Sequence, residues 1–385
     1  MNGLSNTVSG KTILFLDHAA ALGGGQKSLL LLANGLSQLG WDVHIGCPSG
    51  RLMDEAESAG QQTHGISFPR LRGSPAVLSD LIKSSSRILD VTRHIGASCI
   101  VANTIRTSVY TAFASTRTDL PWVWCMRDFW LSESRPKFLL IDKIGKWIIS
   151  NRANLIVANS QAVAENLPAR EKIHVVHNGL DTDNFYSNVG SAWFKSRYEI
   201  PENARVIGMV GRLRPWKGVD RFLRIAAQVH LRFPSAVFLV VGGSPFNVRD
   251  GYAATLPLLA HELGIEDVVI FTGHLEDVRP ALAVMDIFVH PGEPEPFGRV
   301  NIEAMAMQLP VVGFRHGALP EIVIDGKTGI LALPYDETAL VRGILDLLES
   351  HEKSARLGQS GRSRVQSVFT ENKMVEEFSA VLSLL

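Results

Sequence analysis

Residues 286–314, DIFVHPGEPEPFGRVNIEAMAMQLPVVGF, contain every part of one strand–helix–strand unit. The apolar run 286–290 is predicted to be a buried strand, and 310–314 is predicted to be the next one. Between them, the spacing of the apolar residues predicts a helix over 299–308. A strand that is followed by a helix and a second apolar strand is typical of a parallel sheet covered by helices. The unit therefore predicts an α/β fold.

The alternation of strand and helix patterns continues outward from this unit over the whole chain. Further strands are predicted at 12–18, 42–47, 98–104, 122–128, 154–160, 205–211, 236–243 and 268–273. Helical spacing lies between strands at 28–40, 218–232, 253–263 and 277–284. We therefore expect an α/β protein with two doubly wound, Rossmann-like sheets.

The chain of 385 residues is too long for one ordinary core, so two domains are expected. The polar segment 175–186, VVHNGLDTDNFY, contains an Asn-Gly turn signal and separates the two sets of strands. We place the domains at 1–183 and 184–364. Two such domains would face each other across a cleft at the carboxyl ends of their strands, where a large polar ligand is expected.

Composition restricts the class of protein. Lys plus Arg and Asp plus Glu both total 38, so the chain offers no global basic field to nucleic acid. No apolar run reaches the roughly 18 residues of a membrane span. Asp17 and His18 interrupt the apolar run near the N-terminus, so we predict a strand there and not a secretion signal. The cysteines favour a reducing cytoplasm over a disulfide framework or a zinc site; they are Cys47, Cys99 and Cys125.

Two loops have the character of anion-binding sites. In 210–218, VGRLRPWKG, a strand ends and a helix begins, so Arg212 and Lys217 would lie beside helix N–H groups and suit a diphosphate. Taken alone, the two residues have a more ordinary explanation as solvated surface cations. Residues 23–26, GGGQ, hold the same place in the first half, where glycine lets backbone approach a ligand closely. Two more strands end in small residues at the same edge, in VGG at 241–243 and in FTGH at 271–274.

The first-quoted stretch also holds two carboxylates eight residues apart, Glu295 in the loop and Glu303 in the helix. A carboxylate near a helix start is often only a cap. In a cleft, however, a carboxylate accepts hydrogen bonds from the adjacent hydroxyls of a sugar, and the N–H groups of residues 297–299 would hold further oxygens. We therefore interpret the two glutamates as hydroxyl clamps for a ribose and a hexose, not as the acid–base pair of a hydrolase.

Together, these stretches resemble the retaining glycosyltransferases of family 4, which have the GT-B fold of two Rossmann-like domains. The resemblance covers nearly the whole chain and includes 23–26, 175–185, 211–220, 271–278, 293–312, 317–331 and 369–370. It implies transfer of a hexose from a UDP- or GDP-linked sugar to a hydroxyl acceptor, with neither a metal nor another cofactor. The expected role is in glycan, glycolipid or polysaccharide synthesis.

Carried over residue by residue, the resemblance assigns Arg212 and Lys217 to the donor diphosphate. It assigns Glu303 to the ribose hydroxyls and Glu295 to the transferred sugar. Further substrate contacts are expected from Gly24, Gly25, Gly211, Gly243, His274, Phe297, Gly298 and Arg299. The resemblance also implies that residues 365–385 pack back on the first domain.

Some positions depart from the pattern of the family. Arg127 stands where many members have a histidine near the reacting sugar. A guanidinium can hydrogen-bond there, but it cannot lose its proton and act as a base. Gln26 replaces a common glutamate, and Gln308 replaces a frequent glycine after the helix. We count Arg127 as a candidate catalytic residue together with Arg212, Lys217 and Glu295.

Two other functions are consistent with such a chain. A non-catalytic nucleotide-sugar-binding subunit would keep the donor clamp, and the departure at Arg127 keeps this alternative open. A GT-B-like sugar-nucleotide epimerase or a glycan phosphorylase would share both sheets. Those enzymes would need a catalytic acid set or a pyridoxal lysine, and neither stands out in the sequence.

Metal and acceptor need separate consideration. Residues 181–183, DTD, have the spacing of a metal motif from a different glycosyltransferase fold, but a turn in the linker explains them, so no metal is expected.

The acceptor is left open as a glycan, a lipid-linked molecule or a small molecule. The amphipathic segment 137–150, with Lys143 and Lys146 on its polar side, fits either a peripheral membrane patch or a helix buried against its sheet. The buried helix is the more ordinary explanation. We expect a cytoplasmic protein, which the alternative of a membrane patch would place at the inner face of the membrane.

Overall fold

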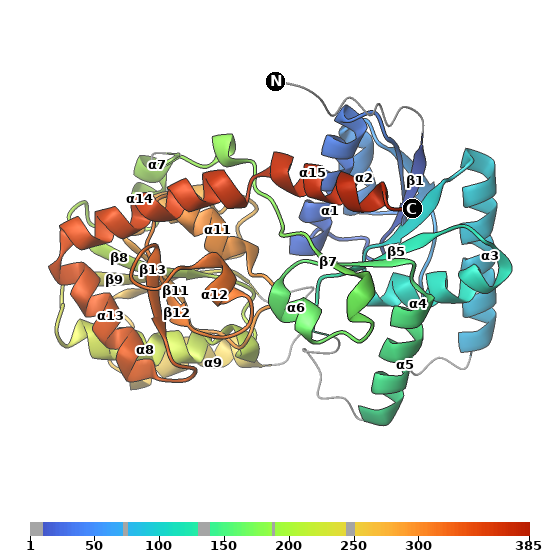
Figure 1. Ribbon diagram of the computed structural model, residues 1–385. Helices are drawn as coiled ribbons and strands as arrows, with labels where there is room; N and C mark the ends of the chain where they lie inside the picture. The colour runs from blue at the N-terminus through green and yellow to red at the C-terminus, as the bar shows by residue number, and fades with distance from the viewer. Residues whose placement is uncertain (1–10, 72–75, 130–138, 187–188, 244–250) are drawn as a thin grey trace, which may run out of the picture. The chain divides into compact units, whose positions relative to one another are not determined.

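The structure, a computed structural model, describes residues 11–71, 76–129, 139–186, 189–243 and 251–385. The chain divides into two compact units: the first is Met1–Gly179 with Glu371–Leu385, and the second is Leu180–Thr370. Each unit contains one parallel sheet with helices packed against it (Figure 1). The predicted α/β class with two Rossmann-like sheets is confirmed.

The first unit has a seven-stranded parallel sheet in the order β3-β2-β1-β4-β5-β6-β7. Its strands are β1 Thr12–Leu16, β2 Asp42–Cys47, β3 Gln62–Gly65, β4 Cys99–Ala102, β5 Trp122–Met126, β6 Leu155–Ala158 and β7 Ile173–Val175. Its helices are α1 Gly24–Gln38, α2 Arg51–Ser58, α3 Val77–Ile95, α4 Ile105–Ala114, α5 Leu139–Arg152, α6 Gln161–Glu165 and α15 Glu371–Leu382. The five predicted strands are present, and the unpredicted β3 and β7 form the two edges of the sheet.

Strand β1 shows why the central strands are apolar along their whole length. Ile13 and Phe15 face the cluster that includes residues of α1 and α15, whereas Leu14 and Leu16 face the cluster that includes residues of α3 and α4. All four side chains are fully buried. A strand that is covered on both faces needs apolar residues at successive positions, not at alternate ones.

Helix α15 brings the end of the chain back to the first unit, where it lies alongside α1 (Figure 1). Gly35 of α1 permits this approach, because a Cβ there would come within 2.3 Å of Cγ2 of Val375. The Nε1 of Trp41 also donates to Oγ of Ser379 at 3.1 Å. The return that we expected over 365–385 is therefore made by α15.

The boundaries between the units differ slightly from the predicted ones. They lie at 179/180 and 370/371, compared with the predicted 183/184 and 364/365. Helix α14 extends to Val368 and packs on α11 within the second unit. The N–H of Leu180 donates to the carbonyl of Phe369 at 2.9 Å, which joins both crossing segments to the second unit.

The second unit has a six-stranded parallel sheet in the order β10-β9-β8-β11-β12-β13. Its strands are β8 Arg205–Val210, β9 Ala236–Val241, β10 Val269–Gly273, β11 Ile287–His290, β12 Val311–Phe314 and β13 Gly329–Ala332. Its helices are α7 Ser191–Arg197, α8 Val219–His230, α9 Tyr252–Glu262, α10 Arg279–Ala283, α11 Arg299–Ala306, α12 Leu319–Ile322, α13 Glu337–Glu349 and α14 His351–Val368. The edge strand β13 was not predicted.

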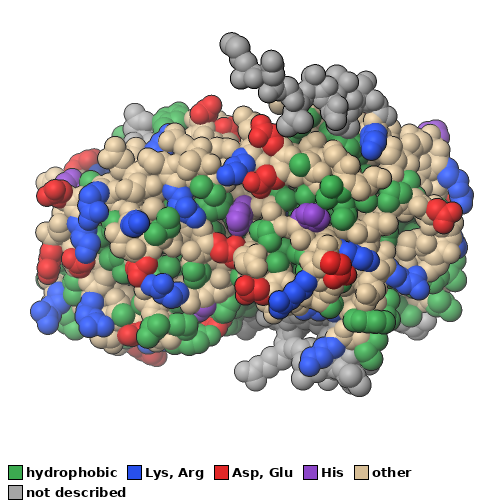
Figure 2. Space-filling model, in the orientation of Figure 1, with side chains coloured by type: hydrophobic (Ala, Val, Ile, Leu, Met, Phe, Trp, Pro, Cys, Tyr) green, Lys and Arg blue, Asp and Glu red, His purple; other side chains and the backbone are tan. Residues whose placement is uncertain are grey.

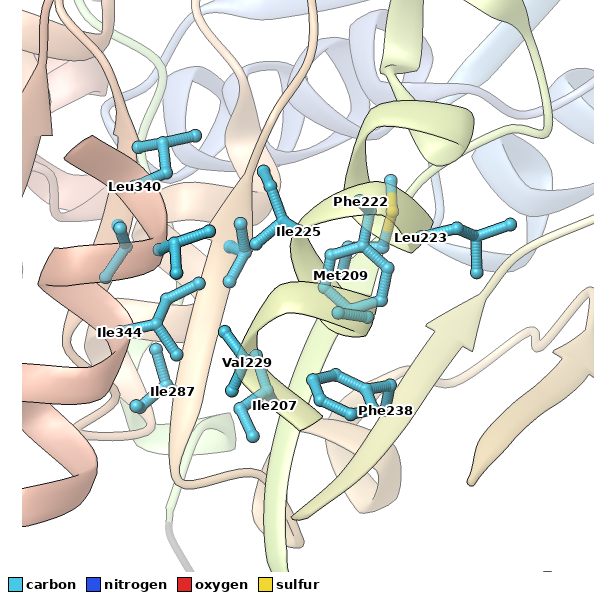
Figure 3. Packing of buried hydrophobic residues seen from close by; sticks show 14 of the residues in the cluster. Ile207, Met209, Phe222, Leu223, Ile225, Val229, Phe238, Ile287, Leu340 and Ile344 are labelled. Atoms are coloured by element: carbon cyan, nitrogen blue, oxygen red, sulfur yellow. The ribbon is translucent and has the colours of Figure 1, made fainter. Parts of the chain in front are cut away.

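The core of the second unit fixes the position of α8, the helix that follows the predicted diphosphate loop. Its buried face carries the residues expected from helical spacing, which are Val219, Phe222, Leu223, Ala226 and Val229. Figure 3 shows side chains of α8 beside those of β8, β9 and α13. Because each fully buried side chain of this size contributes roughly 1.5–3 kcal/mol, α8 is held firmly on the sheet.

The described surface has charges of both signs (Figure 2), and the cysteines form no disulfide. The face shown in Figure 2 intersperses Lys and Arg with Asp and Glu. The cysteines are buried and unpaired, and burial raises the pKa of Cys47 and Cys99 to about 12 and that of Cys125 to about 11. Within the described ranges, no helix combines the length and the apolar character needed to cross a bilayer.

Candidate functional site

The central feature of the second unit is the point where the strand order changes direction. Strands β8 and β11 are neighbours in the sheet although β9 and β10 lie between them in the sequence. In open α/β sheets, ligands bind outside the carboxyl ends of the strands at such a switch point. The loops that leave β8 and β11 there are 211–218 and 291–298, which contain most of the predicted donor residues.

The two loops touch through their backbones. Gly218 has φ +69°, and a Cβ on it would lie 2.5 Å from the carbonyl oxygen of Pro291. A Cβ on Gly292 would lie 2.8 Å from the carbonyl oxygen of Trp216, which accepts the N–H of Glu293 at 2.7 Å. Only glycine allows this approach at both positions. The close packing brings Lys217 and Glu295 to one place.

Lys217 and Glu295 form a short ion pair between Nζ and Oε1, and each side chain is only 17% exposed. Burial is the largest single influence on Glu295 and would raise its pKa, but the charge of Lys217 and the hydrogen bond from it oppose this. His290 and Arg212 act in the same direction, so the pKa of Glu295 lies below its usual value. Glu295 is therefore a carboxylate at neutral pH, as a hydroxyl acceptor must be.

His290, the last residue of β11, is a site residue that the sequence reasoning missed. Its side chain is 8% exposed, and its Nε2 lies 4.0 Å from Oε1 of Glu295. Burial is the main cause that lowers the pKa of His290 to about 4, so the imidazole is neutral at pH 7. A histidine at the carboxyl end of a buried strand, one loop away from the key glutamate, was the available signal.

The free energy of unfolding is expected to decrease as the pH falls from about 6.5 to about 4. The pKa of His290 is about 4 in the folded chain, against 6.5 for an unperturbed histidine. The unfolded chain therefore binds a proton at His290 more readily across this window. Full protonation of His290 lowers the free energy of unfolding by about 3 kcal/mol. Urea unfolding at pH 7 and pH 4.5 measures the effect, with His290→Asn as the comparison because it lacks the titrating group. An equal acid dependence in both proteins would show that His290 is not its source.

The start of α11 is built from Phe297, Gly298 and Arg299. Gly298 precedes the helix with φ +80° and, as a glycine, has no side chain to cap it. The ring of Phe297 is 2% exposed and packs against Phe369 at a centroid distance of 6.0 Å, so only its backbone faces the loop. Oε1 of Glu303 lies 3.6 Å from Nε of Arg299, one helical turn earlier. Glu303 therefore lies inside α11, where it pairs with Arg299 and does not cap the helix.

The remaining predicted residues of this unit lie at the ends of β8, β9 and β10. The N–H of Gly211 donates to the carbonyl of Val241 at 2.9 Å. Gly243 lies against His274, because a Cβ on Gly243 would come within 3.0 Å of Cβ of His274. Gly211, Gly243 and His274 thus line the same carboxyl edge of the sheet as the Lys217–Glu295 pair.

A second network, which the sequence did not reveal, braces the 291–295 loop against α8. A terminal nitrogen of Arg221 donates to the carbonyl of Pro291 at 2.5 Å, and the other lies 3.4 Å from Oε1 of Glu293. Its Nε lies 3.4 Å from Oε1 of Glu337. The hydroxyl of Tyr335 donates to Oε2 of Glu293 at 2.6 Å and completes the network. Arg221 therefore positions the loop that carries Glu295.

Arg127, Gly24 and Gly25 belong to the first unit. Nε of Arg127 donates to Oδ1 of Asn103 at 2.8 Å, and a terminal nitrogen donates to Oδ1 of Asn178 at 2.6 Å. A Cβ on Gly25 would lie 3.8 Å from Cδ of Arg127, so the glycine start of α1 faces this side chain. Asn103 follows β4, so it lies at the carboxyl end of that strand.

A buried carboxylate organises this edge of the first sheet. Asp17 is fully buried after β1 and accepts the N–H of Ala19 at 2.9 Å. Its oxygens also accept from Nε2 of Gln26, at 3.1 Å, and from Nδ2 of Asn103, at 2.7 Å. Gln26 in turn accepts the N–H of Gly23, so the residue that departs from the family pattern holds the start of α1 in place. Asp17 was not among the predicted site residues.

The comparisons with known proteins cover both units. The family model of glycosyl transferases group 1 matches residues 192–364, and that of glycosyltransferase family 4 matches residues 22–184. The chain belongs to glycosyltransferase family 4. HepE from Anabaena, solved in complex with UDP-glucose, has the same GT-B fold at a TM-score of 0.85 and 26% identity, and the match covers 97% of this chain and 100% of HepE.

Two curated family 4 relatives are similar over part of their length. The D-inositol 3-phosphate glycosyltransferase of Streptomyces avermitilis is 33% identical over 227 residues, which are 56% of this chain and 49% of the relative. A GDP-mannose-dependent alpha-(1-6)-phosphatidylinositol monomannoside mannosyltransferase of Mycolicibacterium smegmatis is 33% identical over 194 residues, 48% of this chain and 49% of the relative. The chain spans about half the length of the curated relatives that it matches.

The metal-like motif of this family 4 chain has a local structural role. Oδ1 of Asp181 accepts the N–H of Asp183 at 3.1 Å, which closes the turn that was expected at 181–183. In the part of the chain that the structure describes, no group of three His, Cys, Asp or Glu side chains is arranged to hold a metal ion.

Proposed function

We propose that this chain is a retaining hexosyltransferase that moves a sugar from a nucleoside diphosphate to a hydroxyl acceptor. The observation that supports it most strongly is the meeting of Lys217 and Glu295 at the β8/β11 switch point. A cation for phosphate and a carboxylate for hydroxyls, side by side, suit the junction of a diphosphate and a hexose. Family membership supports the same reaction class.

In the proposed mechanism, the second unit holds the donor. Lys217 and Arg212 would carry the negative charge that grows on the leaving diphosphate, because charge stabilisation at a fixed position lowers the barrier. Glu295 would hold the hydroxyls of the transferred sugar, and Glu303 those of the ribose. The acceptor would attack from the face that the leaving group occupies, with the diphosphate taking the proton of the acceptor hydroxyl. Arg127 would serve as a hydrogen-bond donor, since its guanidinium keeps its proton.

A panel of nucleotide sugars tests the proposal directly. UDP-glucose is the first probe, since HepE was solved with it, and GDP-mannose is the second, since the mycobacterial relative is named for it. Thermal shift measures binding, and release of nucleoside diphosphate over hours measures slow transfer of sugar to water. Binding with release supports a transferase, and NMR of the product then reports whether the anomeric configuration is retained. Binding without release would favour the non-catalytic subunit, and absence of binding across the panel would contradict the donor site.

Activity is expected to persist in excess EDTA. The charge of the leaving diphosphate would be balanced by Arg212 and Lys217, so a divalent cation has no necessary task. Turnover of the donor with and without EDTA, followed by added Mn²⁺ or Mg²⁺, measures this. Loss on chelation with recovery on metal addition would overturn the metal-independent proposal and return attention to Asp181 and Asp183.

We also propose that the chain contacts a membrane surface, which would give it access to a lipid-linked acceptor. Helix α5 exposes Ile144, Trp147 and Ile148 to 48%, 59% and 40%, at helical spacing on one side. Residues 137–138 of the predicted amphipathic segment lie outside the described residues. Sedimentation with vesicles that contain anionic lipid tests this contact, and Trp147→Gln should reduce it.

A further inference from the structure

The first sheet has its own switch point, where His18 and Thr104 take no part in the donor site proposed above. Strands β1 and β4 are neighbours in the sheet, although β2 and β3 lie between them in the sequence. His18 follows β1 and Thr104 follows β4, and their Nδ1 and Oγ1 atoms lie 2.9 Å apart. As in the second unit, this is the edge where an α/β sheet binds a ligand.

Two arginines belong to segments that meet beside Thr104, since residues 68–69 bond to side chains of α4. A terminal nitrogen of Arg106 donates to the carbonyl of Phe68 at 3.3 Å. The hydroxyl of Tyr110, one turn further along α4, donates to the carbonyl of Pro69 at 2.9 Å. These bonds hold the segment that ends in Arg70 on the start of α4, and Arg70 is exposed. Burial, followed by the charge of Arg70, lowers the pKa of Arg106.

The two guanidinium groups have no carboxylate partner within the ranges that the structure describes. Asp17 is near enough to act on Arg106 and His18. Its oxygens, however, already accept three neighbouring donors, as described above. The N–H donors of Arg70 and most of those of Arg106 are thus available to an anion, which would also relieve their mutual repulsion.

We propose that Arg70 and Arg106, with Thr104 and His18, bind a phosphate or carboxylate group of the sugar acceptor. The proposal rests on the glycosyltransferase function proposed above and names the chemical class of acceptor that the chain would use: a hydroxyl compound that carries an anionic group. Asn103 precedes Thr104 and bonds to Arg127, so an anion here would place the rest of the acceptor beside the candidate catalytic arginine of the same unit.

The experiment compares neutral and phosphorylated forms of one ligand on the full chain. Glucose and glucose 6-phosphate are titrated calorimetrically against the wild type, Arg106→Gln and the double variant Arg70→Gln, Arg106→Gln. The sugar phosphate should bind at least tenfold more tightly than glucose to the wild type, and either variant should lose about tenfold or more of that affinity. Arg93→Gln is the matched control, because it removes one positive charge from an exposed arginine on α3 that pairs with Asp90.

The outcomes separate this proposal from the proposed function. If UDP-glucose or another donor binds and is turned over while glucose and glucose 6-phosphate bind equally, the anionic subsite is wrong and the transferase stands. An equal loss in Arg93→Gln would also overturn it, since general charge would then explain the effect. Competition with vesicles that carry a phosphorylated headgroup identifies the source: displacement of the vesicles by glucose 6-phosphate supports the site with a lipid-borne anion, and tight binding of the sugar phosphate without vesicle binding supports it with a soluble one.

Discussion

Replacing Lys217 with alanine is expected to reduce turnover of the nucleotide-sugar donor by on the order of tenfold to a hundredfold. A charge-assisted contact to phosphate contributes roughly 1.5–3 kcal/mol, and its contribution grows as the leaving group gains charge. Arg212→Ala should act in the same direction. Initial rates and the affinity for the bare nucleoside diphosphate are the measurements, and Arg232→Ala, an exposed cation after α8, is the matched control.

Because Lys217 is paired with Glu295, a double variant tests the role of Lys217 more specifically than a single substitution does. In Lys217→Ala, Glu295 stays largely buried without its main counter-charge, so its pKa should rise and the chain should lose stability. Adding Glu295→Gln removes the unpaired charge and should restore stability without restoring turnover. If the double variant regained both, Lys217 would serve only to neutralise Glu295. Unchanged affinity and rate in both Lys217→Ala and Arg212→Ala would remove the phosphate assignment.

Substitutions of the two glutamates are expected to weaken the binding of different ligands. Glu303→Ala should weaken the bare nucleoside diphosphate, because that ligand contains the ribose whose hydroxyls Glu303 is proposed to hold. Glu295→Ala should leave the diphosphate almost unaffected but weaken the intact donor and lower the rate, because the carboxylate faces the transferred sugar. Truncation penalises only ligands that contain the missing partner, by roughly tenfold or more for a charged acceptor.

Calorimetry on both variants with UDP and with UDP-glucose measures this separation. Glu303→Gln is a useful companion, because it keeps the size of the side chain while losing the charge that faces Arg299. A purely structural role for Glu303 would lower thermal stability and leave both affinities unchanged. Equal losses for the two ligands in Glu295→Ala would contradict its assignment to the sugar.

The elements that carry the second-unit site were predictable from local pattern. The apolar spacing of α8 and the strand β11 before the glutamate loop have the predicted form, and α11 begins at the predicted residue, Arg299. Periodicity sufficed because each of these elements buries one face, or both, against a covered sheet. The edge strands β3, β7 and β13 were missed, since an edge strand depends on the strand beside it, and β3 and β7 have no run of buried apolar residues.

Backbone features that depend on a residue's neighbours were only partly predictable. Gln308 was noted as a replacement for a frequent glycine, and it has φ +63° at the end of α11. The sequence could identify the substitution, but the positive φ arises from the bonds that close the helix, with the N–H of Leu309 donating to the carbonyl of Ala304 at 3.0 Å.

The sequence by itself determined the α/β class, the two sheets, the family and the set of candidate donor residues, because these depend on local periodicity and on motif spacing. Only the tertiary structure decided which of those residues meet. Lys217 and Glu295 are joined because β8 and β11 are adjacent in the sheet and two glycines let their loops touch. His290, Asp17 and the basic group around Arg106 owe their character to burial and to neighbours from other strands. Contacts and desolvation of this kind arise from strand order, which no single segment of the chain encodes.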